Sequence, residues 1–420
     1  MHNNYTEARP KLRADIVFGP AETRQRKTTH YVNDRHTDQF YRIGEKEYFL
    51  LSRMDGQRTL GELAAAYQER FGRPLVPASW AGLFKLLDSR QMLDGKVDWA
   101  KLDELKADTA RKRRESQRWY FHRFRLVNPD PKLDWLLARA RFIFRPVTIA
   151  LALLTIVGVE AFVLLHARSI TGEVWATRWV WSVWPICMGL WLVSAVLHET
   201  AHGLTCKYFG GRVTDMGVMW RYLWFYPYCK LDHTVLFHNR RHRIYVFAAG
   251  TFVNLLFLTP FALMWWLLPA HSLLHIISAR LLIIFNISSF INLIPFVQLD
   301  GYFILAAALG MSDLRREAHA FLKKVVTNQG QWDEEYTSRE KLIYGAYGPL
   351  SFLMSLYVVI VMPVFWYALL TNRLGLGPAT ALAVLLSIVS VGSVLVLLKR
   401  RARRRFAARL ELQRQTAQTA

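Results

Sequence analysis

The chain has 420 residues, of which 52% are hydrophobic and 20% are charged, and its formal net charge is +22. The charged residues lie mostly outside a few long apolar stretches, which excludes an ordinary soluble domain and indicates an integral membrane protein. The positive charge is not evidence for nucleic acid binding, because the basic residues cluster beside the apolar stretches, as anchoring to anionic lipid requires.

The first elements in chain order are expected to form a small domain over residues 1–97. Residues 31–43 have two apolar-aromatic arms around an Asn-Asp pair, which predicts a β-hairpin. Three short helices are expected next: one over residues 44–54, one opened by the capping box of Thr59 and Glu62, and one starting near Pro77. These elements predict a winged-helix-like (α+β) unit with one modest core.

This unit resembles the PqqD-type peptide-binding domains, which accompany enzymes that act on ribosomally made peptides. The resemblance is carried by the hairpin at residues 31–43, residues 47–51, Asp55-Gly56, residues 59–63 and residues 86–93. It implies that a leader peptide adds as a strand to the hairpin edge. A generic winged helix is the alternative. DNA binding is not expected, because the third helix carries few cations, chiefly Lys85 and Arg90.

A charged linker and a helical membrane domain are expected to follow. Residues 98–144 are charge-rich, which predicts a juxtamembrane linker with a helical arm. Segments of about 20 apolar residues can cross the hydrocarbon core. Six segments meet this rule: residues 147–165, 179–197, 244–268, 274–296, 345–370 and 379–398. We therefore expect a mainly α, polytopic membrane domain over residues 145–398 with about six transmembrane helices, and a basic tail over residues 399–420.

The basic residues also predict the orientation of these spans. The first apolar run begins after about a third of the chain, so no cleavable signal peptide is expected and the N-terminal domain stays in the cytosol. The basic segments at residues 207–243 and 315–341 and the basic tail then face the cytosol as well. The sequence thus predicts a multi-pass protein of the cytoplasmic (inner) membrane with both termini in the cytosol.

The second apolar segment ends in His198-Glu-Thr-Ala-His202, a spacing typical of zinc metallopeptidases. Residues four apart lie on one face of a helix, so both imidazoles can bind one zinc ion while Glu199 faces the activated water. A catalytic zinc needs a third protein ligand. We expect this ligand to be Asp300, because the second and fourth spans both end on the cytosolic side; an ordinary Asp-Gly turn is the alternative. Cys206 is interpreted as a small helix residue, and a spare metal ligand is the alternative.

Other polar groups near the spans give weaker signals. His233, His238 and His242 lie among arginines and are interpreted as a surface basic loop, not a second metal site. The three cysteines are scattered, so no disulfide framework is expected. Glu160 and Arg280 lie near the outer ends of two spans, and we expect them to pair or to share a water-filled pocket, because an isolated charge in hydrocarbon is costly. Extension of both side chains to the outer interface is the alternative.

Residues 145–398 resemble the site-2 protease class of membrane zinc metallopeptidases. The matching motifs are His198 to His202, residues 249–254 and residues 292–301. The resemblance implies that His198, His202 and Asp300 bind zinc, that Glu199 is the general base, and that Asn254 and Asn292 contact the substrate. Thr251 stands where the family often has proline, and a buried helix-contact asparagine is the alternative for Asn254.

The aromatic segment at residues 213–229 has two interpretations. The resemblance implies a membrane-dipping hairpin that presents a strand edge to an extended substrate. An interfacial belt of aromatic side chains is the alternative.

The sequence therefore predicts a membrane-embedded zinc endopeptidase that hydrolyses a peptide or membrane-protein substrate, linked to the processing of a ribosomally made peptide. The expected partners are this substrate, a leader peptide at the N-terminal domain and the lipid bilayer, with no nucleic acid. A non-proteolytic peptide-binding or export accessory protein is the alternative, and the complete ligand set argues against it.

Overall fold

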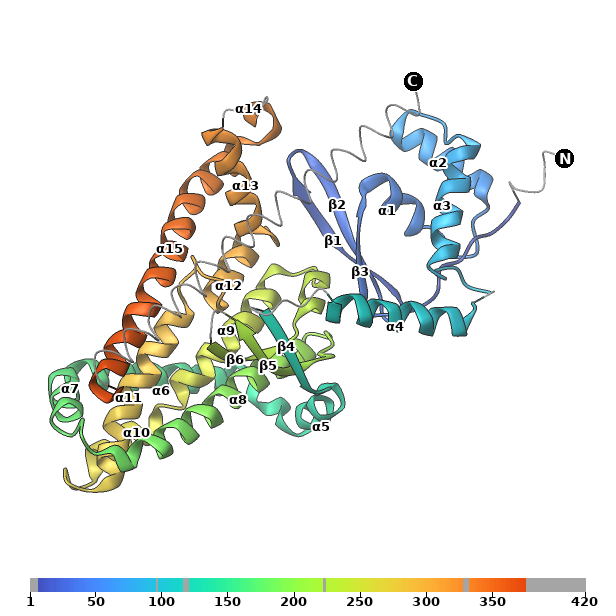
Figure 1. The fold of residues 1–420 in the computed structure, drawn as a ribbon. Coiled ribbons are helices and arrows are strands. Elements are labelled where there is room, and N and C mark those ends of the chain that lie inside the picture. The colour runs from blue at the N-terminus through green and yellow to red at the C-terminus, as the bar shows by residue number, and fades with distance from the viewer. Residues whose placement is uncertain (1–6, 96, 116–120, 222–223, 328–331, 375–420) are drawn as a thin grey trace.

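The structure is a computed structural model that describes residues 7–95, 97–115, 121–221, 224–327 and 332–374. Over these residues the chain is mainly helical, with two small antiparallel sheets. Figure 1 shows the N-terminal part as a separate unit beside a group of long helices. The sixth expected span, residues 379–398, and the basic tail lie outside the described residues.

The N-terminal unit begins with a three-stranded antiparallel sheet in the order β1 (Ile16–Arg24), β2 (Lys27–Asp34) and β3 (Gln39–Gly44). Strands β2 and β3 form the predicted hairpin, but the predicted position of its turn is wrong. Asn33 and Asp34 belong to β2, because they pair with Phe40 and Gln39 of β3. The buried Asp34 carboxylate accepts hydrogen bonds from Arg13 at 2.6 Å and from the His36 amide at 3.0 Å. The chain therefore turns after Asp34.

Three helices complete this unit: α1 (Glu45–Leu51), α2 (Leu60–Phe71) and α3 (Pro77–Ser89). The capping box that was expected to open α2 is present. The Glu62 amide donates to Thr59 Oγ1 at 3.2 Å, and the Thr59 amide donates to Glu62 Oε2 at 2.8 Å. The helices and the sheet enclose an apolar core that includes Val32, Leu51, Leu63 and Leu87.

Residues 98–144 were expected to form a linker with one helical arm, but they contain two helices, a strand and a 3-10 turn. It forms α4 (Trp99–Glu115), β4 (Phe121–Val127), α5 (Asp130–Ala140) and a 3-10 turn, η1 (Arg141–Phe144). Strand β4 pairs with β5 (Met216–Arg221), which pairs with β6 (Trp224–Cys229), so the second sheet has the order β4-β5-β6. The aromatic segment thus forms an antiparallel hairpin, joined by a strand from the linker.

The rest of the described chain consists of helices. They are α6 (Pro146–Leu165), α7 (Ala167–Ala176), η2 (Trp181–Val183), α8 (Trp184–Tyr208), η3 (Asp232–Leu236), α9 (Arg240–Leu256), α10 (Thr259–Leu267), α11 (Leu273–Asn292), α12 (Asp300–Leu309), α13 (Leu314–Val326), α14 (Trp332–Glu335) and α15 (Ser338–Leu374).

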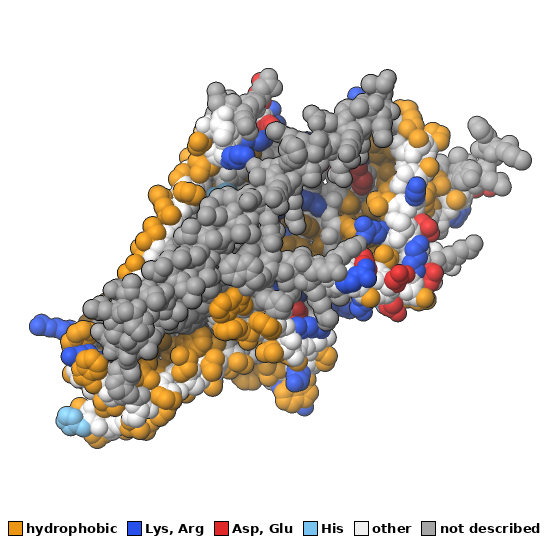
Figure 2. Space-filling view, in the orientation of Figure 1, with side chains coloured by type: hydrophobic (Ala, Val, Ile, Leu, Met, Phe, Trp, Pro, Cys, Tyr) orange, Lys and Arg blue, Asp and Glu red, His pale blue; other side chains and the backbone are white. Residues whose placement is uncertain are grey.

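Within the described ranges, three helical segments are long and apolar enough to cross a membrane: Pro146–Leu165, Arg240–Leu267 and Leu273–Asn292. They coincide with the first, third and fourth expected spans. The second expected span is α8, which extends to Tyr208, beyond the motif that was expected at its end, and the fifth lies within α15. Figure 2 shows hydrophobic side chains along the outer side of α15 and over the lower helices, whereas charged side chains gather mostly on the N-terminal side.

Two expected spans contain breaks at prolines. The third is divided into α9 and α10, and Pro260 occupies the first turn of α10, where a missing amide is harmless. The fourth ends at Asn292, before Pro295, and the chain re-enters a helix at Asp300. Helix α8 contacts both α9 and α11.

The N-terminal sheet packs against segments that connect the helices of the helical part. The Asp38 carboxylate accepts from His233 Nε2 at 3.2 Å and forms an ion pair with Lys230, and the Gln25 amide donates to Glu340 Oε1 at 2.9 Å. His233 is only 4% exposed, so its assignment to a surface loop was wrong. Lys230 and His233 in that segment are buried because both contact the Asp38 carboxylate.

Among the interactions of the described residues there is no direct ion pair of Glu160 and Arg280, and each has another partner. Glu160 Oε2 accepts from Asn286 Nδ2 at 2.8 Å. Arg280 donates to the Thr177 carbonyl oxygen and lies over the ring of Trp184. Polar groups on neighbouring helices thus replace the predicted ion pair.

Candidate metal centre

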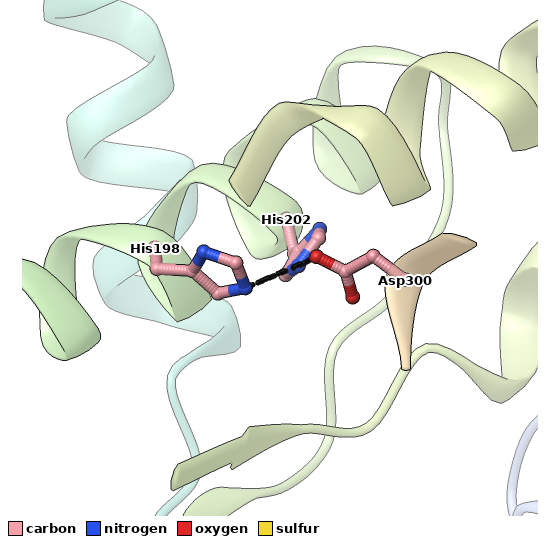
Figure 3. Close-up of side chains that lie close together, drawn as sticks. All are labelled: His198, His202 and Asp300. Carbon is pink, nitrogen blue, oxygen red and sulfur yellow. Dashed lines mark hydrogen bonds and ion pairs between the residues drawn. The ribbon is translucent and has the colours of Figure 1, made fainter. Parts of the chain in front are cut away.

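Helix α8 places His198 and His202 on one face, because residues four apart are neighbours along a helix. Figure 3 shows both imidazoles directed toward Asp300, which comes from a different segment of the chain. The side chain of His202 is 3% exposed and that of His198 is 12% exposed. The motif therefore lies inside the protein, covered by α9 and by the loop that precedes α12.

Asp300 reaches the histidines because the chain folds back between α11 and α12. It is the first residue of α12, and a helix N-terminus stabilises a carboxylate. A Cβ atom on Gly301 would lie 2.0 Å from the Leu293 carbonyl oxygen, so only glycine fits where the two ends of this loop meet. Asp300 and Gly301 thus belong to a tight connection between α11 and α12, and the Asp300 carboxylate points toward the two histidines.

The three donor atoms have the spacing that a tetrahedral metal site requires. Asp300 Oδ2 lies 3.2 Å from His198 Nε2 and 3.2 Å from His202 Nε2, and the two nitrogens are 3.1 Å apart. Donors bound to zinc at about 2.0–2.1 Å in a tetrahedral arrangement lie roughly 3.3 Å from one another. Among the described residues these three side chains form the one group of His, Cys, Asp or Glu that could hold a metal ion.

Hydrogen bonds around the donors orient two of them. His202 Nδ1 lies 2.7 Å from the Val246 carbonyl oxygen, which keeps the proton on Nδ1 and leaves the Nε2 lone pair free for a metal. Asn292 Nδ2 donates to Asp300 Oδ2 and lies 3.4 Å from His198 Nε2. His198 Nδ1 is buried and has no partner within the described part of the chain.

Gly250 makes room for the two histidines. A Cβ atom at this position would lie 2.4 Å from His202 Nε2 and 2.5 Å from His198 Nε2, closer than any side chain can approach. Both nitrogens would bind the metal, so a methyl group here would occupy the space next to it. The sequence motif contains Gly250, but the role of this residue depends on how α9 packs against α8.

Glu199 lies one step round α8 from the donors and beside the second sheet. It forms a hydrogen bond with the backbone of Cys229, the last residue of β6. Strand β6 pairs with β5 on one side. The carboxylate therefore lies near the three donor atoms and beside the end of an edge strand.

The two asparagines expected to contact substrate have different surroundings. Asn292 lies among the donors. Asn254 Oδ1 accepts from Ser194 Oγ at 3.1 Å, which joins α9 to α8 one turn before His198. Ser194 and Val246 support the site but were not identified from the sequence, because a hydroxyl and a backbone carbonyl in apolar helices give no local signal.

Cys206 packs elsewhere, in an apolar cluster with Leu204, Val213 and Phe237. It is a buried free cysteine, and it does not belong to the group that could hold a metal ion.

Comparison with known proteins supports a metalloprotease-like family. The chain is similar to a protein of Bacillus subtilis (strain 168) named "Putative peptide zinc metalloprotease protein YydH", with 28% identity over 153 residues. This stretch is 36% of the present chain and 59% of the relative, so the match spans less than two thirds of the relative's length. No family model matches the chain. No solved structure matches it either.

Proposed function

We propose that this protein is a membrane-embedded zinc endopeptidase of the site-2 protease class, with His198, His202 and Asp300 as the zinc ligands. The observation that carries the proposal is the spacing of 3.1–3.2 Å among three donor atoms from α8 and α12, two helices far apart in sequence. The similarity to a protein named as a peptide zinc metalloprotease supports the same chemistry.

Bound zinc would supply the Lewis acidity that activates water and polarises the scissile carbonyl. Glu199 would take the proton from that water and return it to the departing amine, since its carboxylate is next to the donors. Val246 keeps His202 in the tautomer that binds through Nε2. Asn292 would hold the Asp300 carboxylate in place. If the carboxylate binds the metal instead, the Asn292 amide would be free to donate to a substrate oxygen.

The substrate would bind as an extended strand. An edge strand offers unpaired backbone groups, and β6 ends beside Glu199. Peptide addition there would bring a scissile bond to the donors. Asn254, whose oxygen accepts from Ser194, would act mainly by holding α9 against α8.

The N-terminal unit, residues 1–97, would be a PqqD-like domain that binds the leader of a ribosomally made peptide. Its strand β3 pairs only with β2 in the described sheet, so it has an edge where a leader could add. Residues 98–144 would connect it to the peptidase domain at residues 145–398. We place the protein in the cytoplasmic membrane with both termini in the cytosol.

The direct test is the Glu199→Gln variant of the full-length protein in detergent. We expect it to bind as much zinc as the wild type but to have lost cleavage of labelled casein and of a quenched fluorescent peptide library. Glu160→Gln is the matched control, because it neutralises a carboxylate in α6 that contacts Asn286, away from the metal donors. It should keep both zinc and cleavage.

Equal cleavage by wild type and Glu199→Gln would refute the mechanism. A wild-type protein that binds peptide but neither holds zinc nor cleaves would instead favour the second candidate function, a peptide-binding or export accessory protein. The edge of β3 is the observation that favours that second function.

A further inference from the structure

A second polar site lies between the N-terminal unit and the helical part, away from the metal centre. It is a cavity of about 140 Å³. One wall comes from β1 and β2, and the opposite wall comes from the start of α9 and the turn after α12. Its lining residues are Pro20, Ala21, Glu22, Tyr31, His238, Arg240, Arg243, Gly310 and Ser312.

The cavity has an excess of positive charge. Two arginines and a histidine line it, and Glu22 is the one acidic residue among them. The Glu22 carboxylate is already neutralised, because Oε2 accepts from Arg42 Nη2 at 3.2 Å and Oε1 accepts from the Ser312 amide at 2.7 Å. Glu22 is shared between Arg42 and Arg243, so this one carboxylate leaves the cavity with a net positive charge.

The two arginines also have unused hydrogen-bond donors. Arg243 Nη2 donates to the carbonyl oxygens of Val235 and Phe237, at 2.7 and 3.2 Å, but its buried Nε has no acceptor. The Arg240 guanidinium lies against Gly310, where a Cβ atom would be 2.6 Å from Arg240 Cζ, and it has no hydrogen-bond or ion-pair partner among the described residues. Arg243 Nε is thus a buried donor without an acceptor, which is costly, whereas Arg240 is an exposed guanidinium at the mouth of the cavity. Both groups favour an anionic ligand.

The backbone adds to this preference. Helix α9 has 17 residues and begins at Arg240, next to the cavity. The Asn239 side chain accepts from the Arg241 amide, and the Asn239 carbonyl oxygen accepts from the His242 amide at 3.1 Å. The start of α9 therefore contributes mainly through the helix dipole, whose positive end attracts anions.

We propose that this cavity binds a phosphate group. A phosphate offers several acceptor oxygens, and the guanidinium groups of Arg240 and Arg243 and the imidazole of His238 line one wall of the cavity together. The site lies at the start of Arg240–Leu267, a segment long and apolar enough to cross a membrane, which is where lipid headgroups are found. The phosphate can belong to an anionic lipid or be free in the cytosol. In either case it would connect the N-terminal unit to the helical part.

The test compares Arg240→Gln with Arg241→Gln. Both variants remove one positive charge from the first turn of α9, but Arg241 does not line the cavity. The Arg240 side chain is exposed, so its loss should not affect folding, and unchanged zinc content would verify this. Binding is measured on the full-length protein by thermal stability in two titrations. One adds inorganic phosphate to protein in nanodiscs of phosphatidylcholine, at constant ionic strength, and the other raises the fraction of phosphatidylglycerol.

We expect saturable stabilisation of wild type and Arg241→Gln in at least one titration, and about tenfold weaker binding by Arg240→Gln, as the loss of a charge-assisted hydrogen bond predicts. A response to inorganic phosphate identifies a free ligand, and a response to phosphatidylglycerol alone identifies a lipid headgroup. The proposal is wrong if neither probe binds the wild type, or if both variants lose binding equally. Because the readout does not involve cleavage, it is independent of the proposed peptidase activity.

Discussion

The metal centre and the contact between the N-terminal unit and the helices both bring together charged groups from distant parts of the chain. The two regions differ in whether these groups pair with one another. At the contact, Asp38 accepts from His233 and pairs with Lys230, so opposite charges meet directly. At the metal centre, two imidazole nitrogens and one carboxylate oxygen point at a common position. Paired charges hold parts of the molecule together, whereas convergent donors indicate a ligand.

The proton affinity of Asp38 follows from this pairing. Burial alone would raise the pKa of its carboxyl group, but the His233 hydrogen bond and the Lys230 ammonium hold the pKa well below its usual range. Because the folded-state pKa is lowered, the contribution of Asp38 to stability is fully present above the unfolded-state pKa of about 3.9 and is lost as the pH falls through the folded-state pKa. The contact should thus be intact at neutral pH.

The largest effect is expected for the donors themselves. Replacement of Asp300 or His198 by alanine removes one of three convergent donors, so zinc affinity should fall by more than the roughly 10–100-fold that follows loss of an outer-shell partner. Zinc per chain, measured by metal analysis after dialysis, should fall from about one toward zero. His271→Ala changes an exposed histidine and should keep its zinc. Zinc retention by Asp300→Ala would contradict the ligand assignment.

A single methyl group should also disturb the centre. Gly250→Ala would place a Cβ atom within 2.5 Å of both imidazole nitrogens, so we expect zinc loss although alanine favours a helix by about 1 kcal/mol. Gly189→Ala in α8 is the matched control, because no atom lies within 4 Å of its added methyl group. Equal zinc content in the two variants would show that the histidines do not lie where the structure places them.

A smaller effect is expected at the paired contact. Asp38→Asn removes the charge but keeps the shape, and we expect a loss of about 2 kcal/mol in the free energy of docking, typical of hydrogen bonds to charged groups. Hydrogen exchange should then accelerate in β2, β3 and residues 230–236. Asp232→Asn is the control, since this exposed carboxylate lies 3.6 Å from Lys230 and should contribute little. If the two variants exchange alike, the contact does not hold the N-terminal unit.

The smallest effect is expected at a position outside both the metal centre and the contact around Asp38. Thr59→Ala removes the capping box of α2, which should cost about 1 kcal/mol in the stability of the N-terminal unit without changing zinc content. Glu69→Ala, on an exposed position of the same helix, should change the stability much less. Chemical denaturation followed by circular dichroism measures both. A change in zinc content of Thr59→Ala would show that the stability of the N-terminal unit affects the metal centre.

The sequence predicted features that depend on local spacing. Helical geometry predicts that His198 and His202 lie on one face of α8. Thr59 and Glu62 form a capping box that indicates the start of α2. Three of the expected spans were found because hydropathy is a property of each segment alone. The break at Pro260 also had a local signal, which the span prediction did not use.

Features that depend on distant partners were not predictable in this way. Strand β4 has apolar Phe124 and Leu126 alternating with arginines, a period of two that indicates a strand, but its partner β5 lies about ninety residues later. The close approach of Gly250 to the histidines depends on how α9 packs on α8. Glu160 and Arg280 were matched by depth in the membrane, whereas the structure gives each a partner on an adjoining helix or loop.

The central claim is that one zinc ion binds between α8 and the start of α12. X-ray absorption spectroscopy at the zinc edge on the purified full-length protein tests it most directly. We predict about one zinc per chain, with only nitrogen and oxygen neighbours at about 2.0–2.1 Å and the multiple-scattering pattern of two imidazoles. Absence of zinc, or a sulfur neighbour at about 2.3 Å, would contradict the assignment of His198, His202 and Asp300.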